Sequence, residues 1–115
     1  MTKNKQSTKW FSDRQELSVA KALDGRRTPM SGASNFYKGD VVTKDWMIEC
    51  KTQEKERKSF SVKKEWLEKA TEEAFATGKS NVAIAFNFGG EDQTNNYYII
   101  SEKDMKRLIE ESEKS

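Results

Sequence analysis

The sequence contains no histidine and only one cysteine, Cys50, among its 115 residues. Catalysis by serine–histidine–aspartate or cysteine–histidine groups is therefore excluded, and so are zinc sites that need histidine or several cysteines. A single cysteine also excludes an intrachain disulfide and favours a reducing compartment. No P-loop motif is present, so ATP hydrolysis is not expected. Chemistry based on oxygen ligands is what remains.

Long hydrophobic runs are missing as well. No apolar stretch approaches the roughly 20 residues that a membrane-spanning helix needs, and the polar start lacks the apolar core of a signal peptide. We therefore expect an intracellular, cytoplasmic protein with a polar, mobile tail over residues 1–10 and one domain over residues 11–115. Three tryptophans and six phenylalanines supply a modest core, although 35% of the residues are charged.

Positive charge is concentrated in the first part of the chain. Residues 1–66 carry 15 Lys or Arg and 9 Asp or Glu, whereas residues 67–115 carry 6 and 10, so the net charges are +6 and −4. Phosphate contacts dominate the affinity of proteins for nucleic acids, and the basic part therefore predicts a nucleic-acid-binding face. The alternative is that the lysines serve solubility alone.

Capping residues and hydrophobic periodicity predict elements in the order α-β-β-β-α-β-β-α, which is an α/β fold. The expected helices cover 13–23, about 61–77 and a segment after Ser101, and the expected strands cover 26–30, 39–43, 46–51, 81–88 and 97–100. Ser12 would cap the first helix, and Leu17, Ala20 and Leu23 would form its buried stripe. Ser101 would cap the last helix, with Asp104 at its third position.

Two apolar stretches on either side of a polar pair predict a hairpin. A tight turn at Lys44-Asp45 pairs residue 43 with 46, 42 with 47, 41 with 48 and 40 with 49. Directly opposed residues have Cβ atoms roughly 4.5–5.5 Å apart, so Asp40 and Glu49 would converge. Side chains alternate along a strand, and Lys51 would therefore share the face of Glu49. The opposite, core-facing side would carry Trp46, Ile48 and Cys50.

Two carboxylates and an ammonium group on one strand face are typical of a divalent-metal site with a water-activating base. Carboxylates that are forced together repel, and one pKa rises unless a cation lies between them. Mg²⁺ prefers oxygen ligands and usually takes one or two carboxylates plus phosphate and water. The alternative is an exposed strand face on which Asp, Glu and Lys are solvated and form cross-strand ion pairs.

Gly39-Asp40 followed by Glu49-Cys50-Lys51 resembles the PD-(D/E)XK nuclease signature. Farther upstream, a helix with Glu16 and a Ser-Gly loop at Ser31 are similar to the archaeal-type Holliday junction resolvases, whose phage-encoded members are close to this chain in size. The resemblance covers roughly residues 13–88. It implies a restriction-endonuclease-like core, in which helices flank a mixed central β-sheet. Glycine stands where the signature has proline, and the charged segment after the lysine matches nothing in it.

For the metal centre, the resemblance implies hydrolysis of DNA phosphodiesters with Mg²⁺ or Mn²⁺ as the cofactor. Asp40 and Glu49 would hold the metal, and the backbone carbonyl of Cys50 would add a ligand. Lys51 would orient or deprotonate the attacking water. Glu16 would bind a second metal, directly or through water; the alternative is an ordinary exposed helical glutamate.

For DNA contacts, the resemblance points to the loop ahead of the aspartate. Ser31 would contact the scissile phosphate region, although the same residue types also suit a plain turn. Arg26, Arg27 and Lys38 flank that loop, and we expect them to bind phosphates.

The substrate that the resemblance implies is a branched DNA such as a four-way (Holliday) junction, cut symmetrically by a twofold homodimer. Two alternatives remain. One is another nuclease of the same superfamily, which would be a restriction-type, nicking or single-strand-cutting enzyme. The other is a non-catalytic nucleic-acid-binding or nuclease-inhibiting protein that keeps the fold.

Overall fold

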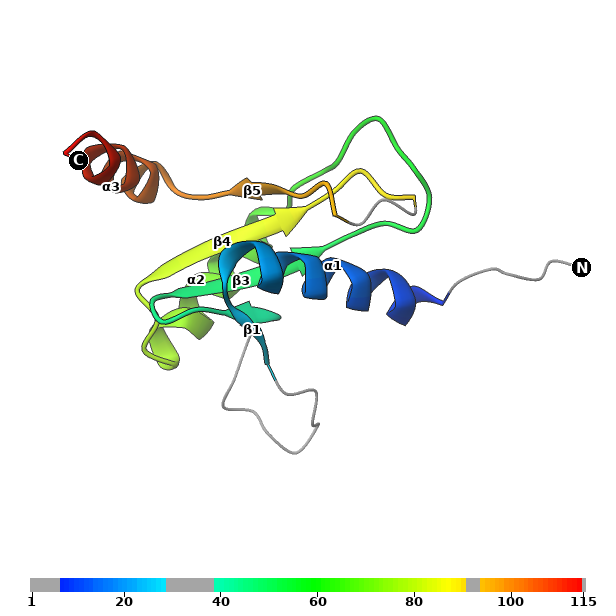
Figure 1. Cartoon of the computed structure of the whole chain (residues 1–115), viewed down its shortest axis with the longest axis horizontal. Helices are drawn as coiled ribbons and strands as arrows, with labels where there is room; N and C mark the ends of the chain where they lie inside the picture. The colour runs from blue at the N-terminus through cyan, green and yellow to red at the C-terminus, as the bar shows by residue number, and fades with distance from the viewer. Residues whose placement is uncertain (1–6, 29–38, 91–93, 115) are drawn as a thin grey trace, which may run out of the picture.

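A computed structural model describes residues 7–28, 39–90 and 94–114. Its elements are α1 (Thr8–Leu23), β1 (Arg26–Arg27), β2 (Val41–Val42), β3 (Trp46–Lys51), α2 (Lys64–Ala76), β4 (Asn81–Phe86), β5 (Tyr97–Ile99) and α3 (Glu102–Glu113). The predicted order of helices and strands is therefore confirmed, and the fold is α/β (Figure 1). Within the described ranges, no helix is both long and apolar enough to cross a membrane.

The five strands form one mixed sheet in the order β1-β2-β3-β4-β5. Neighbouring strands are antiparallel except for β3 and β4, which run parallel. A parallel pair needs a crossover connection, and α2 provides it. In Figure 1, α1 lies in front of the sheet and α2 lies behind it. The expected mixed sheet with flanking helices is thus present.

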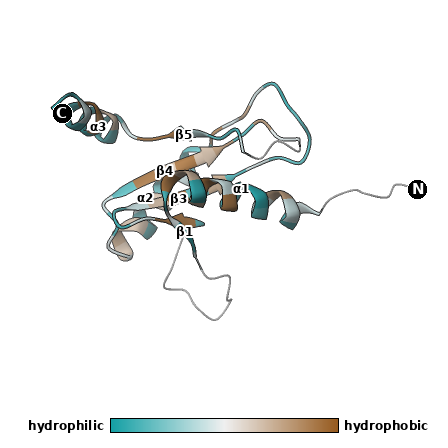
Figure 2. Ribbon diagram, viewed as in Figure 1, coloured by the Kyte–Doolittle hydropathy of each residue, from teal (hydrophilic) through white to brown (hydrophobic). Residues whose placement is uncertain are grey.

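Two hydrophobic cores lie on the two faces of this sheet. The core on the α1 face contains Val19, Val41, Ile48, Ala83 and Ala85. The core on the α2 face contains Val42, Met47, Ala70, Ala74 and Ile84. Apolar residues are concentrated in the central strands, whereas the long connection between β3 and α2 is hydrophilic (Figure 2). Successive residues of β3 alternate between the two cores, as the period of a strand requires.

The first helix begins earlier than its sequence predicts. It starts at Thr8 and not at Asp13, because Ser7 provides the cap and accepts a hydrogen bond from the backbone N–H of Trp10 at 3.1 Å. Both serines suit a cap equally well, and the periodic pattern does not choose between them. Residues 8–10 are helical, so the prediction of a polar tail over residues 1–10 was too long.

The buried face of α1 also differs from the prediction. Leu17 is 56% exposed and Leu23 is 39% exposed, whereas Gln15 is fully buried. The Gln15 amide donates hydrogen bonds to the backbone carbonyls of Lys51 (2.9 Å) and Ala85 (3.3 Å), at the ends of β3 and β4. Buried carbonyls need partners, so a polar residue occupies the inward face and the leucines turn outward.

Several element ends are corrected in the same way. The second helix begins at Lys64 and not near Ser61, which leaves Val62 outside it and 43% exposed. The fourth and fifth strands end at Phe86 and Ile99, ahead of the predicted ends. The predicted cap of the last helix is confirmed, since the Ser101 hydroxyl accepts the backbone N–H of Asp104 at 3.1 Å.

Candidate functional site

The hairpin that carries the candidate site has the predicted register. Val41 pairs with Ile48 and Val42 pairs with Met47. The predicted fourth pair takes a different form, because β2 begins only at Val41. The Asp40 N–H donates to the carbonyl of Ile48 at 2.9 Å, and the Cys50 N–H donates to Asp40 Oδ2 at 2.7 Å. Asp40 thus bonds to the residues on both sides of Glu49 without joining the ladder.

The backbone conformation at Gly39 is one that a proline could not adopt. Its φ is +81°, in the region that favours glycine, and a Cβ atom there would lie 2.5 Å from Cγ of Met47. Proline fixes φ near −65° and does not fit this conformation. The glycine therefore allows the chain to turn into Asp40 against a filled core.

Alternate residues of β3 face different sides, as predicted. Trp46 and Cys50 pack against the core on the α1 face. Glu49 and Lys51 line a cavity of about 190 Å³ under α2. Lys51 Nζ lies 3.6 Å from Glu49 Oε2 and 4.6 Å from the ring centroid of Trp66. The ammonium group is thus held between a carboxylate and an indole ring.

Three acidic groups of this region have raised pKa values. Burial, and then the charge of Asp40, raises the pKa of Glu49 to about 7. Burial raises the pKa of Asp40 against the opposing effects of the Cys50 N–H and Lys51. The pKa of Glu16 is raised by burial first and by Asp40 second. Asp40 therefore disfavours the charge of both glutamates, and a bound cation would relieve this repulsion.

Arg27 partly neutralises the α1 side of this acidic group. Its guanidinium lies 2.9 Å from Glu16 and 2.7 Å from Asp13. Arg26 is exposed and lines a separate cavity of about 270 Å³ together with Lys44 and Lys79. The structure thus places Arg27 beside the carboxylates and Arg26 elsewhere. The predicted Ser31 and Lys38 lie outside the described residues.

The thiol of Cys50 is unsuited to chemistry. Burial, and then the charges of Asp40, Glu16 and Glu49, raises the pKa of this thiol well above its usual range. The thiol therefore stays protonated, as expected of a side chain that faces the core. The predicted role of its backbone carbonyl as a metal ligand stays a prediction.

The donor set suits a hard divalent cation, but the described residues contain no preformed three-ligand group. Within residues 7–28, 39–90 and 94–114, no cluster of three His, Cys, Asp or Glu side chains is arranged to hold a metal ion. Asp40 and Glu49 supply two carboxylates, which is the number that Mg²⁺ commonly uses when phosphate and water complete its shell. The chemistry of the donors therefore fits Mg²⁺ or Mn²⁺.

Residues of α2 complete the cavity, and the sequence did not lead us to expect them at the site. Glu73 raises the pKa of Glu49 further, and Lys69 lies 4.0 Å from the Glu73 carboxylate. Trp66, Ala70 and Glu73 are spaced at i, i+4 and i+7, which places them on one helix face. That spacing was the available signal, but it resembles the pattern of an ordinary buried stripe.

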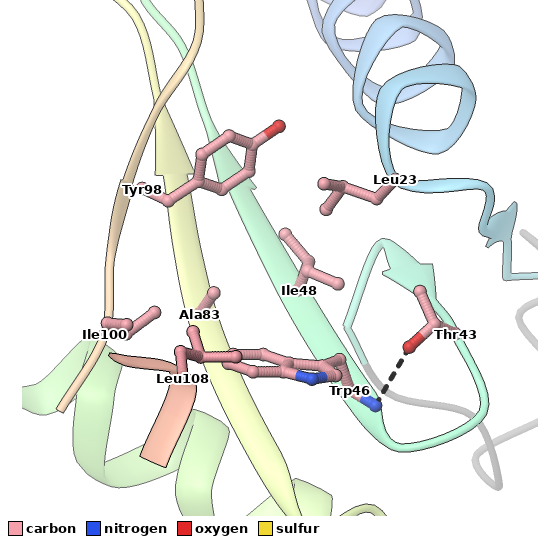
Figure 3. A pocket seen from close by; sticks show the side chains of 8 residues that line it. All are labelled: Leu23, Thr43, Trp46, Ile48, Ala83, Tyr98, Ile100 and Leu108. Atoms are coloured by element: carbon pink, nitrogen blue, oxygen red, sulfur yellow. Dashed lines mark hydrogen bonds between the residues drawn. The ribbon is translucent and has the colours of Figure 1, made fainter. Parts of the chain in front are cut away.

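A larger cavity lies on the opposite face of the sheet. It measures about 400 Å³ and is lined by Leu23, Thr43, Trp46, Ile48, Ala83, Tyr98, Ile100 and Leu108 (Figure 3). The Thr43 hydroxyl accepts the backbone N–H of Trp46 there at 3.1 Å and closes the hairpin turn. Among the described residues, no carboxylate or ammonium group lines this cavity, whereas Glu49 and Lys51 line the cavity under α2.

Comparisons with protein-family models, curated proteins and solved structures find no match to this chain.

Proposed function

We propose that the protein is a metal-dependent endonuclease that hydrolyses DNA phosphodiesters, with Asp40, Glu49 and Lys51 at its centre. One arrangement of three residues carries the proposal. Asp40 accepts the N–H of Cys50, the residue next to Glu49, at 2.7 Å, and burial together with the charge of Asp40 raises the pKa of Glu49 to about 7. Lys51 Nζ lies 3.6 Å from the Glu49 carboxylate. Perturbed carboxylates grouped with a specific cationic partner are typical of catalytic sites.

Asp40, Glu49 and Lys51 would have different roles in hydrolysis. Asp40 and Glu49 would hold Mg²⁺ or Mn²⁺. Burial leaves their charges poorly solvated, and a bound cation would stabilise these charges. A metal at this position lowers the pKa of bound water and stabilises charge on phosphoryl oxygens. Lys51 lies within reach of Glu49 and would orient or deprotonate the attacking water.

Glu16 and Arg27 form the outer part of this site. Glu16 lies near enough to Asp40 for that charge to raise its pKa, which supports a role as a second-metal or water-mediated ligand. Arg27 holds Glu16 in place at 2.9 Å. For Arg27 to bind a DNA phosphate, the phosphate would have to replace one of its two carboxylate partners.

The architecture supports the nuclease proposal at a coarser level. Three antiparallel strands lead through the crossover helix α2 to a parallel fourth strand, in the element order that the resemblance implies. This order favours a restriction-endonuclease-like core. The preference for branched DNA and the twofold homodimer follow from the resemblance alone and complete the proposal.

Two observations favour a second candidate, a nucleic-acid-binding protein without catalysis. No three-ligand metal group is preformed among the described residues, and Glu16 already forms an ion pair with Arg27 at 2.9 Å. Such a protein would bind DNA by its basic surface, and Mg²⁺ would not lead to cleavage.

Cleavage of labelled duplex, single-stranded, flap and four-way DNA, with and without Mg²⁺, separates the two candidates. We expect Mg²⁺-dependent cleavage that Asp40→Asn abolishes while the fold and much of the DNA binding remain. Glu68→Gln is the matched control, because Glu68 is an exposed carboxylate of α2 that pairs only loosely with Lys64 at 3.8 Å. Full activity of Asp40→Asn would remove the proposed site, and binding without cleavage would support the second candidate.

A further inference from the structure

Five aromatic rings gather on the α2 face of the sheet, where β3 and β4 end and β5 begins. Phe86 lies 4.7 Å from Phe60 and 5.6 Å from both Phe88 and Tyr97, measured between ring centroids. Phe60 also contacts Trp66 at 6.1 Å, and Phe88 contacts Tyr97 at 5.6 Å. We call these five residues the aromatic cluster. Each ring touches at least one other, so the cluster is continuous.

The aromatic cluster adjoins the candidate catalytic residues directly. Lys51 pairs with Phe86 across β3 and β4, and Phe86 pairs with Tyr97 across β4 and β5. Directly paired residues lie on the same face of a sheet, so these three side chains form one row that ends at the edge strand. The Lys51 ammonium also lies 4.6 Å from the Trp66 ring. A ligand that reaches Lys51 therefore meets aromatic rings next.

The cluster is not closed off as a core would be. Tyr97 is 46% exposed, and the other four rings are half-buried. The buried residues of the two hydrophobic cores do not include any of these five rings. Apolar surface that stays in contact with water costs free energy, and a contiguous patch of it is typical of an interaction surface.

A basic segment is fixed against the cluster. Residues 51–69 carry 7 Lys or Arg and 4 Asp or Glu, a net charge of +3. The Arg57 N–H donates to the carbonyl of Phe88 at 2.8 Å, and a Cβ atom at Gly89 would lie 2.2 Å from the carbonyl oxygen of Lys55. In Figure 1 the connection between β3 and α2 runs beside the chain that follows β4. The cluster is thus bordered by exposed cations, which include Lys55, Arg57 and Lys58.

We propose that the aromatic cluster and the basic segment 51–69 bind an unpaired stretch of DNA next to the phosphate at Lys51. This proposal deepens the proposed nuclease function and rests on it for the identity of the substrate. Aromatic rings stack on bases of any sequence, and adjacent cations follow the backbone phosphates. An apolar protein partner would make no use of the basic border, whereas a fully paired duplex would offer no free base to the rings.

The consequence concerns which branched DNA is preferred. A strand that leaves a duplex, as in a flap or a splayed arm, presents unpaired bases beside a scissile phosphate. The cluster would select such a strand by stacking. Selection would then depend on unpaired nucleotides and not on the four-way geometry alone.

Binding is measured on the full chain without divalent metal, by anisotropy of a labelled oligothymidine and of a matched duplex at moderate salt. We expect Tyr97→Ala to weaken binding of the single strand roughly tenfold and to change duplex binding far less. Tyr97→Phe keeps the ring and should bind like the wild type. Phe75→Ala is the matched control, because Phe75 is 88% exposed on α2 and belongs to no ring contact of the cluster.

Three results would overturn the proposal. The first is that Tyr97→Ala binds the single strand as tightly as the wild type does. The second is that this variant loses equal affinity for single strand and duplex. The third is that it loses only self-association, as measured by sedimentation. If Tyr97→Ala does not fold, binding is measured instead by the fluorescence of Trp66 in a variant in which Trp10→Phe and Trp46→Phe remove the other two tryptophans. We then expect quenching by oligothymidine and none by duplex, and no quenching would also overturn the proposal. If Asp40→Asn abolishes cleavage but Tyr97→Ala binds single strands normally, the nuclease function stands and the binding proposal fails. If Tyr97→Ala loses single-strand binding but the wild type does not cleave DNA, only the nuclease function fails.

Discussion

The two faces of the central sheet differ in chemistry although one strand supplies both. On the α1 face, Trp46 and Ile48 of β3 line an apolar cavity of about 400 Å³ (Figure 3). On the α2 face, Glu49 and Lys51 line a polar cavity of about 190 Å³. Within the part of the chain that the structure describes, no carboxylate or ammonium group lines the larger cavity, whereas the smaller one is lined by Glu49, whose pKa is raised to about 7. Volume alone therefore does not locate the chemistry.

The difference arises from what covers each face. The helix α2 brings Trp66, Lys69 and Glu73 over β3, so charged groups are pressed against a partly buried strand. On the other side, α1 ends at Leu23, and α3 covers the cavity only through Leu108 while Met105 and Ile109 stay exposed. The α1 face is thus an incompletely covered core. On the α2 face, burial and neighbouring carboxylates raise the pKa of Glu49.

Substitutions at adjacent positions of β3 test the comparison most directly. Glu49→Gln should reduce cleavage below detection, because it removes metal-ligand charge without changing shape. Ile48→Val, one residue away on the other face, should cost roughly 0.5–1.5 kcal/mol of unfolding free energy and leave the cleavage rate unchanged. Rates measured with Mg²⁺ at equal fractions of folded protein provide the check. A large loss of rate in Ile48→Val would mean that the faces are not independent.

Replacement of the lysine should have the next largest effect. Lys51→Ala should lower the cleavage rate by roughly 10²–10⁴, the range for a positioned proton-transfer group. Lys51→Arg should also be impaired, since a planar guanidinium does not replace a compact ammonium group between Glu49 and the Trp66 ring. Single-turnover rates separate this loss from weaker binding. An active Lys51→Arg enzyme would show that only positive charge is required there.

The dependence of stability on pH provides the smallest effect. The Glu49 carboxyl has an ordinary pKa of 4.5 when unfolded and about 7 when folded, so the folded state binds more protons between these values. The contribution of this carboxyl to the unfolding free energy is greatest below pH 4.5 and is lost as the pH rises to about 7. Glu49→Gln should therefore raise the unfolding free energy at pH 8 by up to about 3 kcal/mol relative to its effect at pH 4. Urea titrations at both values measure it. Equal effects at both would contradict the raised pKa.

Local patterns in the sequence determined much of this outcome. The element order, the hairpin register at Val41–Ile48 and the cap at Ser101 were predicted correctly. The division of β3 into a Trp46–Cys50 side and a Glu49–Lys51 side was also predicted correctly. Each of these features depends on residues within a few positions of one another, where the period of a strand and the chemistry of a cap act directly.

The tertiary structure decided the features that depend on residues far apart in the chain. It turned Gln15 inward in place of Leu17, because the carbonyls at the ends of β3 and β4 needed a donor. It placed Glu73 beside Glu49 and paired Arg27 with Glu16, contacts that no local pattern contains. The raised pKa values also belong to this level, since burial and charge proximity arise only when distant segments pack together.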